Sequence, residues 1–253
     1  MVHDTIRKLN ELPREPRGLN DMNKETLLQA MAETRKKESE LEDLSSDLPA
    51  DPGGKWHPKD HLAHMAWHRE RNARLVDAVR TGSEPPPEGG EDINDKIYAE
   101  TKDRPAAEVI ADARRSWDML EAAIEACNDK EWERPRPYGP PDRKVMDGSP
   151  ADHVAAHLFW CYIEAGNEKD AEGVLVWARD LSLRTSSDPK THAVATYNLA
   201  CYYARTGQVP ETVSLLRESF KADPGLKDWS HKDPDLDEIR EDPRMVELIG
   251  APA

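Results

Sequence analysis

Residues 56–68 read WHPKDHLAHMAWH, and this stretch decides how the first half of the chain is interpreted. Proline is favoured at the first position of a helix, where its missing N–H would have no partner, so we expect a helix to begin at the proline of this stretch. His57, His61, His64 and His68 follow one another with gaps of four, three and four residues. Residues three or four apart share one face of a helix, so these histidines are able to line a single stripe.

Three further long helices are predicted by apolar residues that recur at helical spacing. They lie over residues 23–48, 105–127 and 150–165. Asn23 is a suitable N-cap for the first of them, and its apolar stripe is expected to include Leu44 and Leu48. The connecting segments are rich in proline and glycine, which is typical of irregular loops.

These elements predict an all-α fold. We expect a four-helix bundle over residues 23–166, preceded by an N-terminal arm over residues 1–22. The alternative architecture is one continuous helical solenoid that runs into the C-terminal part of the chain.

A second histidine pair, His153 and His157, lies four residues apart on the predicted fourth helix. In a bundle, one histidine of the second helix and this pair are able to converge on one metal ion. Three protein ligands and an open position are typical of catalytic zinc-type sites. A bound metal lowers the pKa of a coordinated water, or binds a thiolate as the nucleophile. The alternative is that the histidines cap helices or form local hydrogen bonds.

Within the first histidine cluster, His64 is the preferred ligand because it lies beside the apolar stripe of its helix. His68, one turn further on, is the next candidate. His57 and His61 are expected to be surface or capping residues.

Aromatic side chains offer candidates for the wall of a cleft at the mouth of the bundle. Trp67, Tyr98 and Trp160 are these candidates, and their alternative role is that of ordinary core aromatics. Asn94 is expected to cap a helix rather than to bind a ligand. Cys161 has the features of a small buried apolar residue.

The sequence resembles a known protein family. The stretch 56–68, the segment 93–98 and the helix around residues 114–120 resemble the DinB-like superfamily and are similar to its ClbS/DfsB branch, over roughly residues 23–165. The resemblance implies a four-helix bundle in which His64, His153 and His157 bind a divalent metal ion, such as Zn, Ni or Mn.

The resemblance also implies a chemistry. Some members of the superfamily are thiol-dependent transferases or isomerases, so a low-molecular-weight thiol is a possible second cofactor. ClbS-type proteins carry a tyrosine at the position of His64, and they act on a genotoxic small molecule. Metal chemistry and metal-free ClbS-type chemistry are therefore alternatives here, and the histidines favour the metal.

The C-terminal part, residues 167–253, is similar to a tetratricopeptide repeat. Residues 192–222 predict two helices on either side of a turn at Gly207, and a proline follows them. The tail over residues 229–244 resembles the ending common after such repeats, and we expect it to cover the end of the helical stack. Its covering side chains are expected to be Leu236, Ile239, Met245 and Leu248.

The composition limits the possible partners. The formal net charge is −15, so binding to nucleic acids or to anionic membrane surfaces is disfavoured. No apolar stretch approaches the length that spans a bilayer, and the N-terminus has no signal-peptide pattern. Three scattered cysteines, one of them at Cys127, favour a reducing compartment, so a cytoplasmic location is expected.

Three hypotheses for function remain open. The first is a metal-dependent hydrolase or thiol transferase that acts on a small electrophilic molecule. The second is a non-catalytic scaffold whose repeat module binds a protein partner or a second copy of the chain. The third is a metal-free ClbS-like protein that confers resistance to a small molecule.

Overall fold

The computed structural model describes residues 23–90, 92–138 and 150–250. These residues form helices and connecting loops, and no β-strand occurs among them, so the predicted all-α fold is confirmed. The arm predicted for residues 1–22 and most of the irregular crossing predicted between the third and fourth long helices lie outside the described residues. The described chain divides into two compact units, residues 23–161 and residues 162–250.

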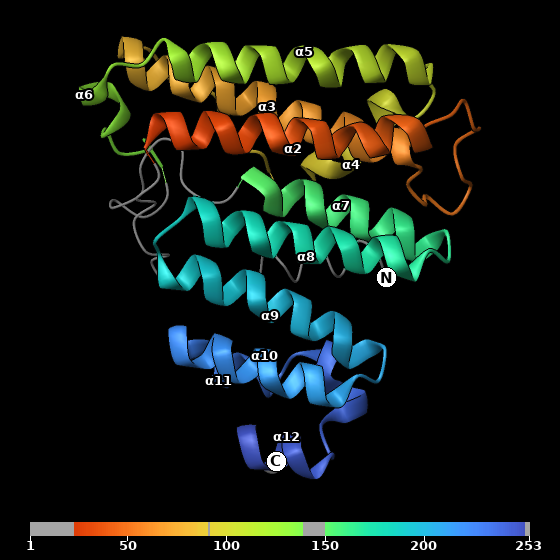
Figure 1. Cartoon of the computed structure of the whole chain (residues 1–253). Coiled ribbons are helices and arrows are strands. Elements are labelled where there is room, and N and C mark those ends of the chain that lie inside the picture. The colour runs from red at the N-terminus through yellow and green to blue at the C-terminus, as the bar shows by residue number, and fades with distance from the viewer. Residues whose placement is uncertain (1–22, 91, 139–149, 251–253) are drawn as a thin grey trace. The chain divides into compact units, whose positions relative to one another are not determined.

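The first unit contains the four long helices that the sequence predicts, together with two short ones. Their bounds are α2 Lys24–Leu44, α3 Pro58–Thr81, α4 Ile93–Thr101, α5 Ala106–Glu125, α6 Asp129–Trp132 and α7 Pro150–Glu164. Helices α2, α3 and α5 run side by side and pack against one another (Figure 1). The division between the units falls inside α7, between Cys161 and Tyr162.

Local sequence signals explain where these helices begin. The side chain of Asn23 accepts a hydrogen bond from the backbone N–H of Thr26 at 2.9 Å, as expected of an N-cap. Pro58 is the first residue of α3, and His57 precedes it as the N-cap. The carboxylate of Asp60 accepts a hydrogen bond from the backbone N–H of His57 at 2.8 Å, which completes the start of this helix.

Large apolar side chains fill the interior of the first unit. Those buried most completely are Leu27, Met31, Leu41, Leu62, Met65, Leu75, Ile124 and Leu158. Each buried side chain of this size contributes roughly 1.5–3 kcal/mol relative to an exposed one. The expectation that Leu44 and Leu48 belong to this stripe was wrong, because α2 ends at Leu44 and leaves these side chains 39% and 47% exposed.

A buried ion pair, which the sequence did not reveal, crosses this apolar interior. The Arg69 guanidinium donates to both carboxylate oxygens of Glu38, and its Nε donates to the Ser116 hydroxyl at 2.9 Å. The indole N–H of Trp117 donates to the same carboxylate at 3.0 Å, and the guanidinium carbon lies 4.3 Å from the centre of the Trp117 ring. The pair therefore links α2, α3 and α5.

The second unit is a succession of helices that lead into a short tail. Their bounds are α8 Glu168–Thr185, α9 Pro189–Arg205, α10 Val209–Ala222, α11 Gly225–Ser230, η1 Pro234–Ile239 and α12 Pro243–Ile249. Helix α9 packs against both α8 and α10 (Figure 1). Gly207 adopts φ 74° directly after α9, a conformation that favours glycine, and so allows the chain to turn into α10.

The tail packs onto the core of α9 and α10. Leu236, Ile239 and Met245 are buried in this core, as predicted, and Leu248 is partly buried against it. The described tail therefore covers apolar side chains of the preceding helix pair.

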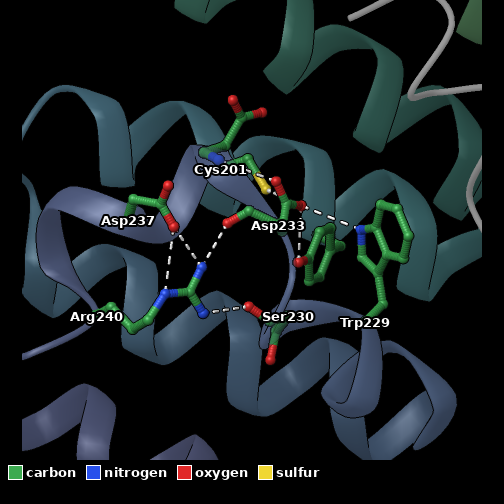
Figure 2. A network of polar contacts seen from close by, with 8 residues as sticks. Cys201, Trp229, Ser230, Asp233, Asp237 and Arg240 are labelled. Carbon is green, nitrogen blue, oxygen red and sulfur yellow. Dashed lines mark hydrogen bonds and ion pairs between the residues drawn. The ribbon is translucent and has the colours of Figure 1, made fainter. Parts of the chain in front are cut away.

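One carboxylate anchors the tail to α9 (Figure 2). Asp233 Oδ2 accepts hydrogen bonds from the Tyr197 hydroxyl at 2.9 Å and from the Trp229 indole at 3.2 Å. Arg240 donates to the backbone carbonyls of Ser230 at 2.8 Å and of Asp233 at 2.7 Å. These bonds fix the chain between α11 and η1 against α9.

None of the helices in the described part of the chain combines the length and the apolar character that crossing a lipid bilayer requires.

Candidate metal centre

The structure brings together three histidines that the sequence singled out. His64 lies on α3, and His153 and His157 lie one turn apart on α7. One ring nitrogen of each is within 4.8 Å of the corresponding nitrogens of the other two. Nε2 of His64 and Nε2 of His153 are 3.0 Å apart, within hydrogen-bond distance. The two helices are therefore level with each other at this point.

The same three rings form a compact group. The ring centres of His64 and His153 are 5.0 Å apart, those of His64 and His157 are 4.9 Å apart, and those of His153 and His157 are 4.7 Å apart. The rings are tilted steeply against one another and are not stacked. Their nitrogens, and not their faces, therefore approach one another.

Burial differs across the group. His64 and His157 are only 3% and 0% exposed, whereas the described residues leave His153 exposed. Nδ1 of His64 and Nε2 of His157 are buried and make no hydrogen bond. Buried polar atoms are nearly always paired, so the unpaired Nε2 of His157, which has no protein group to bond, indicates a missing partner.

The protonation of these histidines suits metal binding. Burial lowers the pKa of His64 and of His157 well below the usual value, and the neighbouring imidazoles lower it further. Both rings are therefore neutral near pH 7 and carry a free lone pair. A neutral imidazole is the form of histidine that binds metal ions.

The spacing also fits an ion. Two nitrogens that each lie 2.0–2.1 Å from one zinc ion in tetrahedral geometry are about 3.3 Å from each other. The 3.0 Å between the Nε2 atoms of His64 and His153 is close to this value. This pair of nitrogens thus has nearly the spacing of two ligands of one ion, and the third nitrogen, on His157, lies within 4.8 Å of both.

The expectation for His61 was wrong. His61 is 1% exposed, and its Nδ1 lies 2.7 Å from Nδ1 of His157. The reason is that the start of α3 is buried on every side, since all residues from Lys59 to Ala66 are buried. A helix without a solvent face has no amphipathic pattern, so the sequence had no signal that placed His61 inside.

His68 and Asn94 lie next to the group. The ring centre of His68 is 4.5 Å from that of His64 and 5.6 Å from that of His153, but His68 is not among the three histidines with converging nitrogens. Burial lowers the pKa of His68 to about 4.

The expectation that Asn94 caps a helix was also wrong, because Asp92 holds the N-cap position of α4 and Asn94 lies inside this helix. Hydrogen bonding with the Asn94 side chain raises the pKa of both His64 and His68. Its Oδ1 is buried and makes no hydrogen bond of normal geometry.

Aromatic rings enclose part of the cluster. Trp56, which was not among the predicted cleft residues, lies with its ring centre 5.3 Å from that of His64 and 6.5 Å from that of His157. Tyr98 stacks on Trp56 at 6.1 Å, and its hydroxyl is buried without a hydrogen-bond partner.

The other two predicted cleft residues are placed differently. Trp67 lies 5.0 Å from His68, at the edge of the cluster. Trp160 is 9% exposed and packs edge-on against Phe159 at 5.3 Å, which is the arrangement of a core aromatic.

A second group of potential ligands lies in the C-terminal unit. Cys201, Asp233 and Asp235 bring one sulfur and two carboxylate oxygens within 4.8 Å of one another. Burial and the neighbouring carboxylates raise the pKa of Cys201 well above its usual value, so the thiol is protonated. Its sulfur lies 3.6 Å from Oδ2 of Asp233, which also accepts from Tyr197, so the hydrogen bonds of the tail explain this arrangement (Figure 2).

The fold and the site together define a class of protein: a helical bundle with three imidazoles from two helices at one point. The sequence pattern of the DinB superfamily matches residues 8–160, which is more than half of the chain, so the chain belongs to the DinB superfamily. Searches of curated proteins and of solved structures found no significant match.

Proposed function

We propose that this protein is a metal-dependent enzyme that acts on a small electrophilic molecule, by hydrolysis or by transfer of a low-molecular-weight thiol. The observation that carries the proposal is the convergence of His64, His153 and His157, in which the buried Nε2 of His157 lacks a partner. Membership of the DinB superfamily supports it, because its members are often metal-binding.

The donor set narrows the choice of metal. All three proposed ligands are imidazole nitrogens, which suit zinc and nickel, whereas manganese prefers oxygen ligands. We therefore place zinc or nickel ahead of manganese. Three protein ligands leave a coordination position for water or for a thiol.

The residues around the site have separable tasks. A divalent ion held by His64, His153 and His157 would supply an activated water or thiolate at neutral pH. His64 and His157 provide neutral lone pairs from a buried position, and His153 supplies the third imidazole. Burial raises the pKa of Tyr98, so its unpaired hydroxyl stays protonated and is available to donate a hydrogen bond to a substrate oxygen.

A metal-free ClbS-like activity is the weaker alternative, because this chain has His64 where ClbS-type proteins carry a tyrosine.

A scaffolding role remains a separate proposal for the C-terminal unit. It is supported by the succession of α8, α9 and α10, in which α9 packs against both neighbours as in a helical repeat. In this role the C-terminal unit would bind a protein partner or a second copy of the chain. The cytoplasmic location of the protein stays a prediction.

Cobalt substitution tests the proposed chemistry directly. Chelator-treated protein without a histidine tag is loaded with Co²⁺, and its visible absorption is recorded before and after addition of a small thiol. Three-imidazole coordination predicts a d–d spectrum, and thiol binding predicts a new sulfur-to-cobalt charge-transfer band. A d–d spectrum without a thiol band favours hydrolysis over thiol transfer, and the absence of any cobalt spectrum contradicts the proposal. His231→Ala, an exposed residue of the other unit, is the control variant.

A further inference from the structure

We propose that His61 holds the His157 ring in the tautomer and orientation that metal binding requires. This inference rests on the proposed function, because His157 is one of its three ligands. His61 is a positioning residue in this account, since it acts through His157 and is not one of the three histidines whose nitrogens converge.

The contact between the two rings is direct and buried. Nδ1 of His61 lies 2.7 Å from Nδ1 of His157, and the two side chains are 1% and 0% exposed. The residues are 96 positions apart in the sequence, so tertiary packing of α3 and α7 creates this contact. Because both rings are buried, water does not compete for the hydrogen bond between them.

The direction of the hydrogen bond follows from the other nitrogen of His157. Two neutral rings share one proton across the Nδ1···Nδ1 contact, so either ring is able to donate. If His61 donated, His157 would carry its own proton on Nε2, and that buried N–H would have no acceptor. If His157 donates, its Nε2 presents a lone pair instead. Only the second arrangement leaves His157 ready to bind an ion.

The orientation of the His157 ring is restricted on two sides. The hydrogen bond to His61 fixes its rotation, because it requires Nδ1 to face α3. Trp56 lies almost parallel to the ring, at an interplanar angle of 10° and a centre distance of 6.5 Å. Metal-binding histidines commonly donate their second N–H to a neighbouring group that fixes tautomer and orientation. Here an imidazole takes the place of the usual carboxylate or carbonyl.

The first test reads the tautomer without any metal. Long-range ¹H–¹⁵N correlation spectra of chelator-treated protein distinguish a protonated from an unprotonated ring nitrogen. We expect Nδ1 of His157 to be protonated and Nε2 to be unprotonated in the wild type. A proton on Nε2 of His157 would overturn the inference, even if no variant of His61 folded.

The second test compares two variants of similar bulk. His61→Leu removes the acceptor, and His61→Asn keeps one, because the amide oxygen of asparagine occupies the place of Nδ1. We expect His61→Leu to weaken Zn²⁺ binding by about 10- to 100-fold, measured by competition with a chromophoric chelator. His61→Asn should stay much closer to the wild type. His57→Asn, which changes the N-cap of the same helix to another good cap, should leave the affinity unchanged.

The outcomes separate this inference from the proposed function. Equal Zn²⁺ affinity of the wild type and His61→Leu, with His157 in the same tautomer in both, would overturn the role of His61. Equal losses in His61→Leu and His61→Asn would overturn it as well, because the acceptor would then not matter. A wild type that binds no Zn²⁺ would contradict the proposed function, and the tautomer spectra would still decide the role of His61.

Discussion

The Nε2 atoms of His64 and His153 lie 3.0 Å apart, although 89 positions separate the two residues in the sequence. The hydrogen bonds within each helix do not determine this distance. It is determined by how α3 and α7 are positioned along each other in the first unit. The proposed chemistry therefore depends on tertiary packing, and changes to the packing or to the buried polar groups should be measurable at the site.

Acid should destabilise the metal-free protein before most carboxylates are protonated. Burial lowers the pKa of His61 to about 3, whereas an unfolded histidine has a pKa near 6.5. Below pH 6.5 the unfolded chain therefore binds more protons than the folded one, and the free energy of unfolding falls as the pH falls. Each such histidine contributes a slope of about 1 kcal/mol per pH unit.

Urea unfolding in the presence of a chelator measures this slope between pH 7.5 and pH 5. His157→Gln removes one buried imidazole and should give a shallower slope. A free energy of unfolding that does not change over this range would show that the cluster is not buried in solution.

Replacing one partner of the buried ion pair should lower the free energy of unfolding more than replacing both partners. Arg69→Met leaves the Glu38 carboxylate buried without its partner, which should lower the free energy of unfolding by about 3–5 kcal/mol. The double variant Glu38→Leu/Arg69→Met should recover much of this loss. Arg74→Ala breaks an exposed pair with Glu70 and should change stability by less than about 1 kcal/mol. A double variant as unstable as the single one would contradict this reasoning.

Asn94 should support His64 through its amide oxygen. Nδ1 of His64 and Oδ1 of Asn94 are both buried, and hydrogen bonding with the Asn94 side chain raises the pKa of His64. Asn94→Leu should therefore weaken Zn²⁺ binding by roughly 10-fold, whereas Asn94→Asp keeps an acceptor and should bind more tightly than Asn94→Leu. Chelator competition gives both values. Identical affinities in the two variants would show that Asn94 does not act on the ligand.

The tail of the second unit offers a matched pair of helix caps. Asp233 and Asp242 both precede a proline and accept a hydrogen bond from a backbone N–H two residues on, at 3.0 Å and 2.9 Å. Asp242→Ala should cost about 1 kcal/mol, as is typical of a lost cap.

Asp233→Ala should cost clearly more, about 2–5 kcal/mol, because it also leaves the Tyr197 hydroxyl and the Trp229 indole without their acceptor. Thermal unfolding of both variants measures the difference. Equal costs would show that the buried hydrogen bonds around Asp233 add nothing to its role as a cap.

The sequence was sufficient where the determining signals are local. Asn23 and the His57-Pro58 pair mark helix starts through hydrogen bonds and backbone geometry within a few residues, and both predictions are confirmed. The four-residue spacing of His153 and His157 places them on one face of a helix for the same reason. Membership of the DinB superfamily was likewise recognisable from the stretch around these signals.

The sequence was insufficient where burial depends on distant parts of the chain. His61 was expected to be a surface or capping residue, but the start of α3 has no solvent face. The pairing of Glu38 with Arg69 joins two helices across the core, and two charged residues 31 positions apart carry no signal of it. Asn94 is inside α4 and not at its start, because Asp92 holds the N-cap position.

The central claim is that His64, His153 and His157 share one divalent ion, and metal stoichiometry tests it most directly. Untagged protein is stripped with a chelator, reloaded with Zn²⁺, passed through gel filtration and analysed by inductively coupled plasma mass spectrometry. The account predicts about one zinc ion per chain for the wild type and a small fraction of that for His153→Ala and His157→Ala, with unchanged helical circular dichroism. Full zinc content in either variant would contradict it.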